Sequence, residues 1–374
     1  MSDTKTKTRK KIDFDSPAVQ DEMNNITHGT FVKQGTMVAF PTGFPGATIP
    51  ILADESHITA LDTSRQGFVY GGTSGKRSHI FVGMFHGVTG MIFDMNAVDG
   101  ATHCSAVCCG KTKFLACVNG PSGGGRILTS NLEPWPYDLI QEWGFERHPF
   151  DDLGEVAASE PIVHAVADAS RDHAVGATTH HLFTVDFAAP KIQVVEEVSG
   201  SGRLALGSKG SILGSDGAGH LWRFDPQTRK LQREAFKLPT GRWEKTPAAW
   251  ARVAQTGLLY TADDDGQLFS FDEQRGFSAA LGKTLLAPVY CMAATFDGRV
   301  FGSCGSGIAK MFCYDPGRHE ITNLGVAVSL FERRRYGYVF GAAVTGRDGE
   351  IVFGEDDDGG HLWLYFPRIQ AASA

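Results

Sequence analysis

The sequence predicts an all-β protein, a seven-bladed β-propeller closed by an N-terminal strand. Apolar and aromatic runs recur after Gly-rich or Asp-rich turns, about 45 residues apart on average, which is the period of a four-stranded propeller blade. Glycine supplies 45 of the 374 residues, as many tight hairpin turns require. The runs are anchored at Met91, Ile127, Leu182, Leu221, Leu268, Met311 and Leu362.

The strand order within a blade can be assigned in the sixth unit. There VYCMAAT, RVFGS, KMFCYD and HEITNLG are the innermost, second, third and outer strands, separated by turn residues. Each anchored run is therefore expected to be a third strand. The seventh unit has no fourth strand after Phe366, so FVKQGTMVAF or SHITALD near the N-terminus is expected to supply it. Such closure removes the sheet edges.

The predicted domain organisation is a single propeller. Residues 1–30 are expected to be an N-terminal tail, partly disordered, and residues 31–374 the propeller. The range 131–158 interrupts the repeat and is interpreted as an inserted loop over one face. Its Trp135 and Trp143 either stack on a sugar at the channel or are buried.

Composition excludes some classes of partner. The formal net charge of -7 gives no extended basic surface, so we expect no nucleic-acid partner. No apolar stretch is long enough to span a membrane, and the basic N-terminus has no apolar core behind it, so we expect a cytoplasmic protein without a secretory signal. The seven cysteines are interpreted as buried reduced thiols, with Cys108 and Cys109 on opposite faces of a strand.

Site residues are expected at the mouth of the central channel, where innermost strands begin and where second strands connect to third strands. His103, His164, Trp250 and Tyr290 fall near the starts of innermost strands, and His86 falls in the expected second-to-third loop of the first unit. The segment ERRRYGY, just before the seventh innermost strand, adds three further candidates. These are Arg335, Tyr336 and Tyr338.

This set of side chains suits proton abstraction next to a carboxylate. Such a reaction needs a base, a cation that holds the carboxylate, and an acid for the leaving oxygen. Histidine, arginine and tyrosine can fill these parts. His164, Asn119, Trp250 and Tyr338 are interpreted as substrate contacts. Each candidate histidine or tyrosine is alternatively a packing residue, because a shift of one position turns a side chain away from the channel.

Weaker signals have structural interpretations. His181, His220 and His361 occupy the same repeat position as Gln267 and Lys310, which favours a structural role. The acidic loops at 263–266 and 355–359 are interpreted as hairpin turns, with Ca²⁺ binding as the alternative. The Gly-rich segment from Asn119 to Gly125 lacks a P-loop lysine, although it would let a ligand approach the backbone.

The seven-unit ring, the histidines His86 and His103, and the segment RRRYGY resemble the seven-bladed propeller polysaccharide lyases, which include ulvan lyases and rhamnose-α-1,4-glucuronate lyases. The resemblance covers residues 67–366 in architecture. It implies β-elimination on a uronic acid in an anionic oligo- or polysaccharide. It assigns His86 and His103 to base and orientation, Tyr290 or Tyr336 to proton transfer, and Arg335 to the carboxylate.

Two alternatives stay open. One is a metal-dependent propeller hydrolase or lyase in which His86, His103, His164 and His180 surround an ion. The cofactor is then a divalent metal, Ca²⁺, Mn²⁺ or Zn²⁺; the sequence alone leaves it unknown. The other is a non-catalytic propeller that binds proteins, although the recurring Gly-His and Trp-Asp dipeptides of WD40 repeats are absent.

Overall fold

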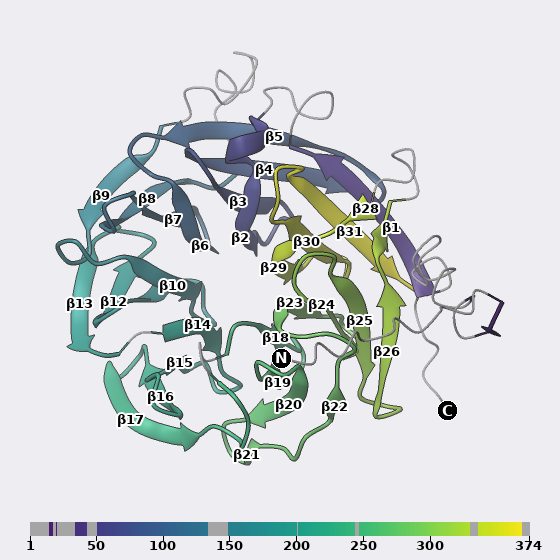
Figure 1. Ribbon diagram of the computed structural model, residues 1–374. Helices are drawn as coiled ribbons and strands as arrows, with labels where there is room; N and C mark the ends of the chain where they lie inside the picture. Colours follow the sequence, from purple (N-terminus) through teal and green to yellow (C-terminus); the bar gives the residue numbers. More distant parts are fainter. Residues whose placement is uncertain are drawn as a thin grey trace, which may run out of the picture.

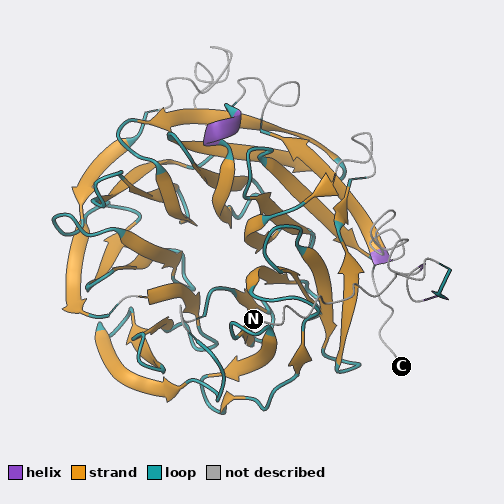
Figure 2. Ribbon diagram, viewed as in Figure 1, coloured by secondary structure: helices purple, strands orange, loops and turns teal. Residues whose placement is uncertain are grey.

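Seven antiparallel sheets form a ring around a central channel in the computed structural model, which Figure 1 shows along the ring axis. The structure describes residues 15–17, 20, 34–42, 51–133, 149–199, 201–243, 247–329 and 336–368. Strands, drawn orange in Figure 2, dominate this part of the chain, and the short helix η1 (Ala53–Glu55) precedes the first blade. The predicted all-β seven-bladed propeller is confirmed.

Each blade contains four strands in chain order from the channel outward, except at the ring closure. Blade 1 comprises β2 (His57–Thr63), β3 (Val69–Ser74), β4 (Ser78–His86) and β5 (Thr89–Val98). Blade 2 comprises β6 (His103–Cys109), β7 (Lys113–Asn119), β8 (Gly125–Asn131) and β9 (Asp151–Glu155). Blade 3 comprises β10 (Ile162–Ala167), β11 (His173–Thr178), β12 (His181–Asp186) and β13 (Ile192–Glu197). Blade 4 comprises β14 (Ser201–Leu206), β15 (Ile212–Ser215), β16 (His220–Asp225) and β17 (Lys230–Lys237).

The other three blades follow the same order. Blade 5 comprises β18 (Trp250–Arg252), β19 (Leu259–Ala262), β20 (Gln267–Asp272) and β21 (Gly276–Phe277), with β22 (Gly282–Lys283) also paired to β20. Blade 6 comprises β23 (Val289–Ala294), β24 (Val300–Cys304), β25 (Lys310–Asp315) and β26 (Glu320–Gly325). Blade 7 comprises β29 (Phe340–Thr345), β30 (Ile351–Glu355), β31 (His361–Pro367) and β1 (Gly35–Pro41). A small ribbon of β27 (Ala327–Val328) and β28 (Tyr336–Gly337) lies between blades 6 and 7 in the chain.

The N-terminal strand closes the ring, as predicted. β1 pairs antiparallel with β31 along its whole length, from Gly35 opposite Pro367 to Pro41 opposite His361. Of the two candidate segments, FVKQGTMVAF therefore supplies the fourth strand, whereas SHITALD forms β2, the innermost strand of blade 1. The pairing completes blade 7 from both ends of the chain.

Apolar side chains fill a layer between every two neighbouring blades, which explains why the strands read as continuous apolar runs. In β12, Leu182 packs towards blade 4 and the adjacent Phe183 packs towards blade 2. Successive side chains of a strand point to opposite faces, and here both faces are buried. Cys108 and Cys109 likewise enter different layers, as expected. All seven cysteines are buried free thiols.

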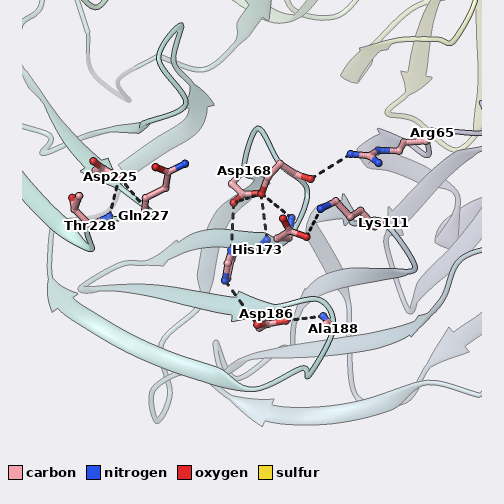
Figure 3. Close-up of polar contacts among 11 residues, drawn as sticks. Arg65, Lys111, Asp168, His173, Asp186, Ala188, Asp225, Gln227 and Thr228 are labelled. Carbon is pink, nitrogen blue, oxygen red and sulfur yellow. Dashed lines mark hydrogen bonds and ion pairs between the residues drawn. The ribbon is translucent and has the colours of Figure 1, made fainter.

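The recurring aspartate at the end of the third strand caps the following turn. The carboxylate of Asp186 accepts hydrogen bonds from the backbone N–H groups of Ala188 and Ala189, at 2.7 and 3.1 Å. Asp225 makes the same pair of bonds to Gln227 and Thr228 (Figure 3). Asp272 and Asp315 repeat the arrangement two and three residues on. The repeated Asp is thus a turn signal.

An aromatic ring of the third strand lies over a glycine of the second strand in four blades. The cross-strand partners are Gly71 and Phe81, Gly176 and Phe183, Gly214 and Trp222, and Gly302 and Phe312. A Cβ atom at Gly214 would lie 2.1 Å from a ring carbon of Trp222. The glycines are therefore required for this packing.

The strand assignment predicted for blade 1 is wrong. Met91, expected in a third strand, lies in the outer strand β5, and the third strand is β4. The turn after His86 joins these two strands, with His86 paired to Thr89. The error arose because β4 and β5 are both apolar runs next to a glycine-containing turn, so either fits the repeat.

Two further expectations concern the periphery. Part of the range 131–158, expected as an inserted loop, forms the outer strand β9, whereas Trp135 and Trp143 lie outside the described residues. Nearly all of the expected tail at 1–30 also lies outside them. In the described part of the chain, no helix has the length and apolarity needed to cross a membrane.

Candidate functional site in the central channel

The innermost strands enclose a cavity of about 420 Å³ in the channel. Most of its lining side chains are small and apolar, such as Ala106, Ala165 and Ala342. Longer polar or aromatic side chains are contributed by β10, β14 and β18, namely His164, Arg203, Trp250 and Arg252, and Asp62, Asp168 and Arg171 also line the cavity. A concave site with a few polar groups among apolar walls is typical of ligand binding.

Arg203 extends across the channel from blade 4 to blade 7, where its Nη2 donates to the carbonyl oxygen of Gly341. Its backbone is held by Trp250, whose indole N–H donates to the Arg203 carbonyl at 3.1 Å. Burial lowers the pKa of Arg203, which starts so high that the group stays charged at neutral pH. Among the described residues, no carboxylate forms an ion pair with this guanidinium. It is therefore available to an anionic ligand.

His164 is a neutral hydrogen-bond donor in this cavity. Its Nδ1 accepts the backbone N–H of Leu204 at 3.2 Å, so the proton of the neutral ring resides on Nε2. Burial, and secondarily the charge of Arg203, lowers the pKa of His164 to about 3. The ring therefore stays uncharged at physiological pH and can offer its Nε2–H to a ligand.

His103 at the start of β6 has its protonation state set by a chain of hydroxyl groups. The Thr59 hydroxyl donates to the carbonyl of Cys104 at 2.7 Å, because a carbonyl oxygen can only accept. Thr59 Oγ1 then accepts from the Ser74 hydroxyl at 2.7 Å. Ser74 Oγ, its hydrogen already used, accepts from His103 Nδ1 at 2.8 Å. With these donors and acceptors assigned, the proton of the neutral His103 ring is on Nδ1 and a lone pair remains on Nε2.

The electrostatic surroundings keep His103 neutral. Burial lowers its pKa, Asp356 raises it and Arg203 lowers it, with a net decrease. The Asp356 carboxylate is itself engaged by His57 Nδ1 at 3.2 Å, and the Asp358 carboxylate by His57 Nε2 at 3.0 Å. The two carboxylates raise the pKa of His57 above its ordinary value. His103 is thus a neutral, exposed imidazole with a free lone pair, near enough to Arg203 for that charge to lower its pKa.

Of the residues predicted from sequence, His164 and Trp250 line the cavity. His103 lies outside this lining and is linked to it through Ser74 and Thr59, of which Thr59 lines the cavity. Tyr290 lies at the irregularity between Val289 and Cys291 in β23, half-buried and outside the cavity lining. The Asn119 amide is taken up by the backbone of Ile162, to which it donates at 2.9 Å and from which it accepts at 2.8 Å. Asn119 thus joins blades 2 and 3.

The other predicted residues lie elsewhere. The expected placement of His86 at the channel mouth is wrong, because it ends β4 at an exposed hairpin to the outer strand. Tyr336 is in the ribbon β27–β28, which Figure 1 shows beside β1 and β31 at the periphery, and Tyr338 has an exposed ring. Arg335 lies outside the described residues.

Arg203 was missed by the sequence analysis. It lies three residues into the segment SGRLALGS, near the start of the fourth innermost strand, so the rule that selected His103 and His164 also applies to it. An irregularity between Ser201 and Ala205 shifts its register against β15. A search for long polar side chains at the starts of innermost strands would have found it.

The far end of the channel is built differently. The Asp168 carboxylate there accepts from the backbone N–H of Asp172 at 3.0 Å and lies 3.4 Å from His173 Nδ1. Lys111 of blade 2 pairs with Asp172 at 2.6 Å, and Figure 3 shows how these contacts join the turns of neighbouring blades. Asp168 is thus committed to a structural network.

The described residues contain no preformed cluster of metal-binding side chains. In the ranges that the structure describes, no group of three or more His, Cys, Asp and Glu side chains is placed to hold an ion. His164 Nδ1 is also occupied by the Leu204 N–H. The histidines before third strands have carboxylate partners instead: His181 lies 3.0 Å from Glu160 and His220 lies 3.5 Å from Asp216.

Comparison with known proteins shows the fold alone. No protein family model matches the chain, and no curated protein matches its sequence. Two solved structures of virginiamycin B lyase from Staphylococcus aureus share the architecture, one of the selenomethionine-substituted enzyme (TM-score 0.61) and one of a catalytically inactive histidine-to-alanine variant with quinupristin (TM-score 0.60). Each is 9% identical to this chain, and each alignment covers 88% of this chain and 99% of the other. The chain is thus similar in fold to propellers that are named lyases.

Proposed function

We propose that this propeller is a lyase that breaks a carbon–oxygen bond by β-elimination on an anionic substrate at the channel mouth. One observation carries the proposal: the hydroxyl chain leaves a lone pair on His103 Nε2, and Arg203, a channel cation without a carboxylate partner among the described residues, is near enough for its charge to lower the pKa of His103. A base beside a carboxylate-binding cation is the minimum that proton abstraction next to a carboxylate requires. The fold shared with proteins named lyases agrees with this reaction class.

The proposed reaction needs no oxidant or co-reactant. Arg203 binds the substrate carboxylate, and His103 Nε2 removes the proton from the carbon next to it. The electron pair forms a carbon–carbon double bond as the bond to the β-oxygen breaks. The protonated His103 then returns its proton to the leaving oxygen. His164 supplies an Nε2–H hydrogen bond to the oxygen on which negative charge develops.

The substrate that we propose is an oligo- or polysaccharide containing a uronic acid. Such a substrate has a carboxylate for Arg203 and a glycosidic oxygen in the β position. Trp250, which is half-buried at the cavity, offers an aromatic face of the kind that packs on sugar rings. Virginiamycin B and quinupristin belong in the same test, because the similar solved structures carry their names.

The test follows the ultraviolet absorbance of the newly conjugated double bond with a panel of uronate oligosaccharides, and the loss of quinupristin and virginiamycin B by chromatography. We expect His103→Ala to lower kcat about a hundredfold or more, and Arg203→Met to raise KM about thirtyfold. The matched control is His319→Asn, at an exposed hairpin residue with φ 53°, a conformation that asparagine tolerates.

Each outcome of this test has a definite meaning. Activity that falls in His103→Ala but persists in His319→Asn and in chelator supports the proposal. Activity that disappears in chelator and returns with Ca²⁺, Mn²⁺ or Zn²⁺ favours the metal-dependent alternative. A folded protein that converts no member of the panel overturns the proposal in favour of a binding propeller.

A further inference from the structure

Arg252 is a second channel cation that the proposed reaction does not use. It ends β18, lines the same cavity as Arg203, and has a buried Nε with no hydrogen-bond partner among the described residues. Burial lowers the pKa of its guanidinium. A buried charge without a partner is costly to folding, and such a feature is often retained for a function.

The nearby carboxylates are already engaged. Glu273 is close enough to oppose the pKa shift of Arg252, but its oxygens accept from the Lys209 N–H at 2.6 Å and from the hydroxyl of Ser211. It therefore holds the turn between β14 and β15. No ion pair joins Glu273 to Arg252 within the described ranges.

The two carboxylates that line the cavity are also engaged. Asp62 accepts from the backbone N–H of Cys109 at 2.7 Å and lies 3.8 Å from Arg171. Arg171 in turn donates to two backbone carbonyls, those of Thr63 and Cys109. Asp168 belongs to the network of Figure 3. The charges of Arg203 and Arg252 therefore stay without carboxylate partners in one cavity.

The two arginines come from neighbouring innermost strands, β14 and β18. Trp250 on β18 joins these strands, because its indole N–H donates to the Arg203 carbonyl. Arg252 follows two residues later on the same strand, which corresponds to a step of about 7 Å along the channel. A ligand with two acidic groups can neutralise both guanidinium charges of this cavity.

We propose that Arg252 forms a second anion subsite and that the natural ligand carries two carboxylates, one bound by Arg203 and the other by Arg252. This inference takes from the proposed function only that ligands bind in the channel. Within that function it narrows the substrate to one with two acidic units. The mixture of two cations and small apolar walls favours such a ligand over a neutral sugar.

The experiment measures calorimetric binding of dicarboxylates from succinate to pimelate and of monocarboxylates with the same carbon numbers. For the unaltered protein, we expect one dicarboxylate length to bind at least tenfold more tightly than its monocarboxylate. In Arg252→Met this preference is expected to disappear while monocarboxylate affinity persists, and the melting temperature is expected to rise. Arg252→Lys retains the charge and should keep part of the preference.

Three results would overturn the inference. They are an unchanged preference in Arg252→Met, a lower melting temperature with no effect on binding, and two independent monocarboxylate sites with no advantage for any dicarboxylate. The inference and the proposed function can fail separately. Binding that depends on Arg252, without any elimination, would support the second anion subsite and contradict the proposed lyase activity. Elimination that depends on His103 and is unchanged in Arg252→Met would support the lyase activity and contradict the subsite.

Discussion

His103 Nδ1 and the Ser74 hydroxyl lie 2.8 Å apart and connect the innermost strand of blade 2 to the second strand of blade 1. The contact directs the His103 proton away from the channel, because the Ser74 hydrogen is committed to Thr59. The orientation and tautomer of the proposed base therefore depend on a neighbouring blade. Ser74 is a positioning residue, since it acts through His103.

Ser74→Ala should lower kcat about tenfold with little change in KM, because His103 loses the acceptor that selects its tautomer. Ser74→Thr retains the hydroxyl and should restore most of the rate. The measurement is steady-state elimination on the substrate found in the panel. Ser303→Ala is the control, because the Ser303 hydroxyl is buried without a partner among the described residues. Equal rates in Ser74→Ala and Ser303→Ala would contradict the role of the Ser74 hydroxyl in setting the tautomer of His103.

The pH dependence of kcat/KM should have an acid limb below 6.5, the ordinary pKa of histidine. Burial lowers the pKa of His103, so the active neutral ring persists to lower pH than in a free imidazole. Asp356 raises the pKa of His103, so Asp356→Asn should move the limb to still lower pH. A limb that stays in place in this variant would mean that His103 is not the group that titrates.

Glu55 should stabilise the fold at neutral pH and cease to do so in acid. Arg77 forms bonds of 2.8 and 2.9 Å to the Glu55 carboxylate, and His79 a bond of 2.9 Å, and together they lower the pKa of Glu55 to about 2. The folded pKa lies below the ordinary 4.5, so the stabilisation is present above 4.5 and lost as pH falls towards 2.

Glu55→Gln should therefore reduce the free energy of unfolding by about 2 kcal/mol at pH 7 and by progressively less below pH 4.5. Denaturant titrations at pH 7, 4.5 and 3 measure this difference. Glu320→Gln, at an exposed position at the start of β26, should change stability little at any of these values. A Glu55→Gln deficit that is the same at pH 3 and pH 7 would show that ionisation is not its cause.

Gly214→Ala should destabilise the protein by about 2–4 kcal/mol, because the added methyl group would lie 2.1 Å from the Trp222 ring. Thermal unfolding measures the effect. Gly317→Ala serves as the control, since the nearest atom to its added methyl group, in the Asp315 carboxylate, would lie 3.3 Å away. If both variants melt alike, Trp222 adjusts without cost and the glycine is not required there.

Much of the fold could be predicted from sequence because two signals recur along the chain, the apolar runs of the blades and, in blades 3 to 6, an Asp after the third strand. The Asp that caps the turn after β12, β16, β20 and β25 comes at a constant position, and the apolar runs follow from layers that are buried on both sides. The strands of blades 6 and 7 and the closing strand β1 were placed correctly. Blade 1 was not, because β4 and β5 carry the same pattern.

The candidate site could be predicted less well, because it depends on irregularities that a sequence does not show. Extra residues interrupt the pairing at the start of six innermost strands, for example between Ile162 and His164 and between Ser201 and Ala205. Each such bulge reverses which side chains face the channel. His103 and His164 were found by position along the strand. Arg203 lies within the irregularity between Ser201 and Ala205 and was missed, although the same positional rule applies to it.

The pairing of β1 with β31 also determines when the ring can close during synthesis of the chain. β1 precedes the other strands of the propeller in the chain, whereas its partner β31 follows all of them. Until β31 is synthesised, β1 has no neighbour and β2 has no blade behind it. A nascent chain of six blades exposes two open layers, which makes it prone to aggregate. Closure of the ring therefore follows the synthesis of all seven blades.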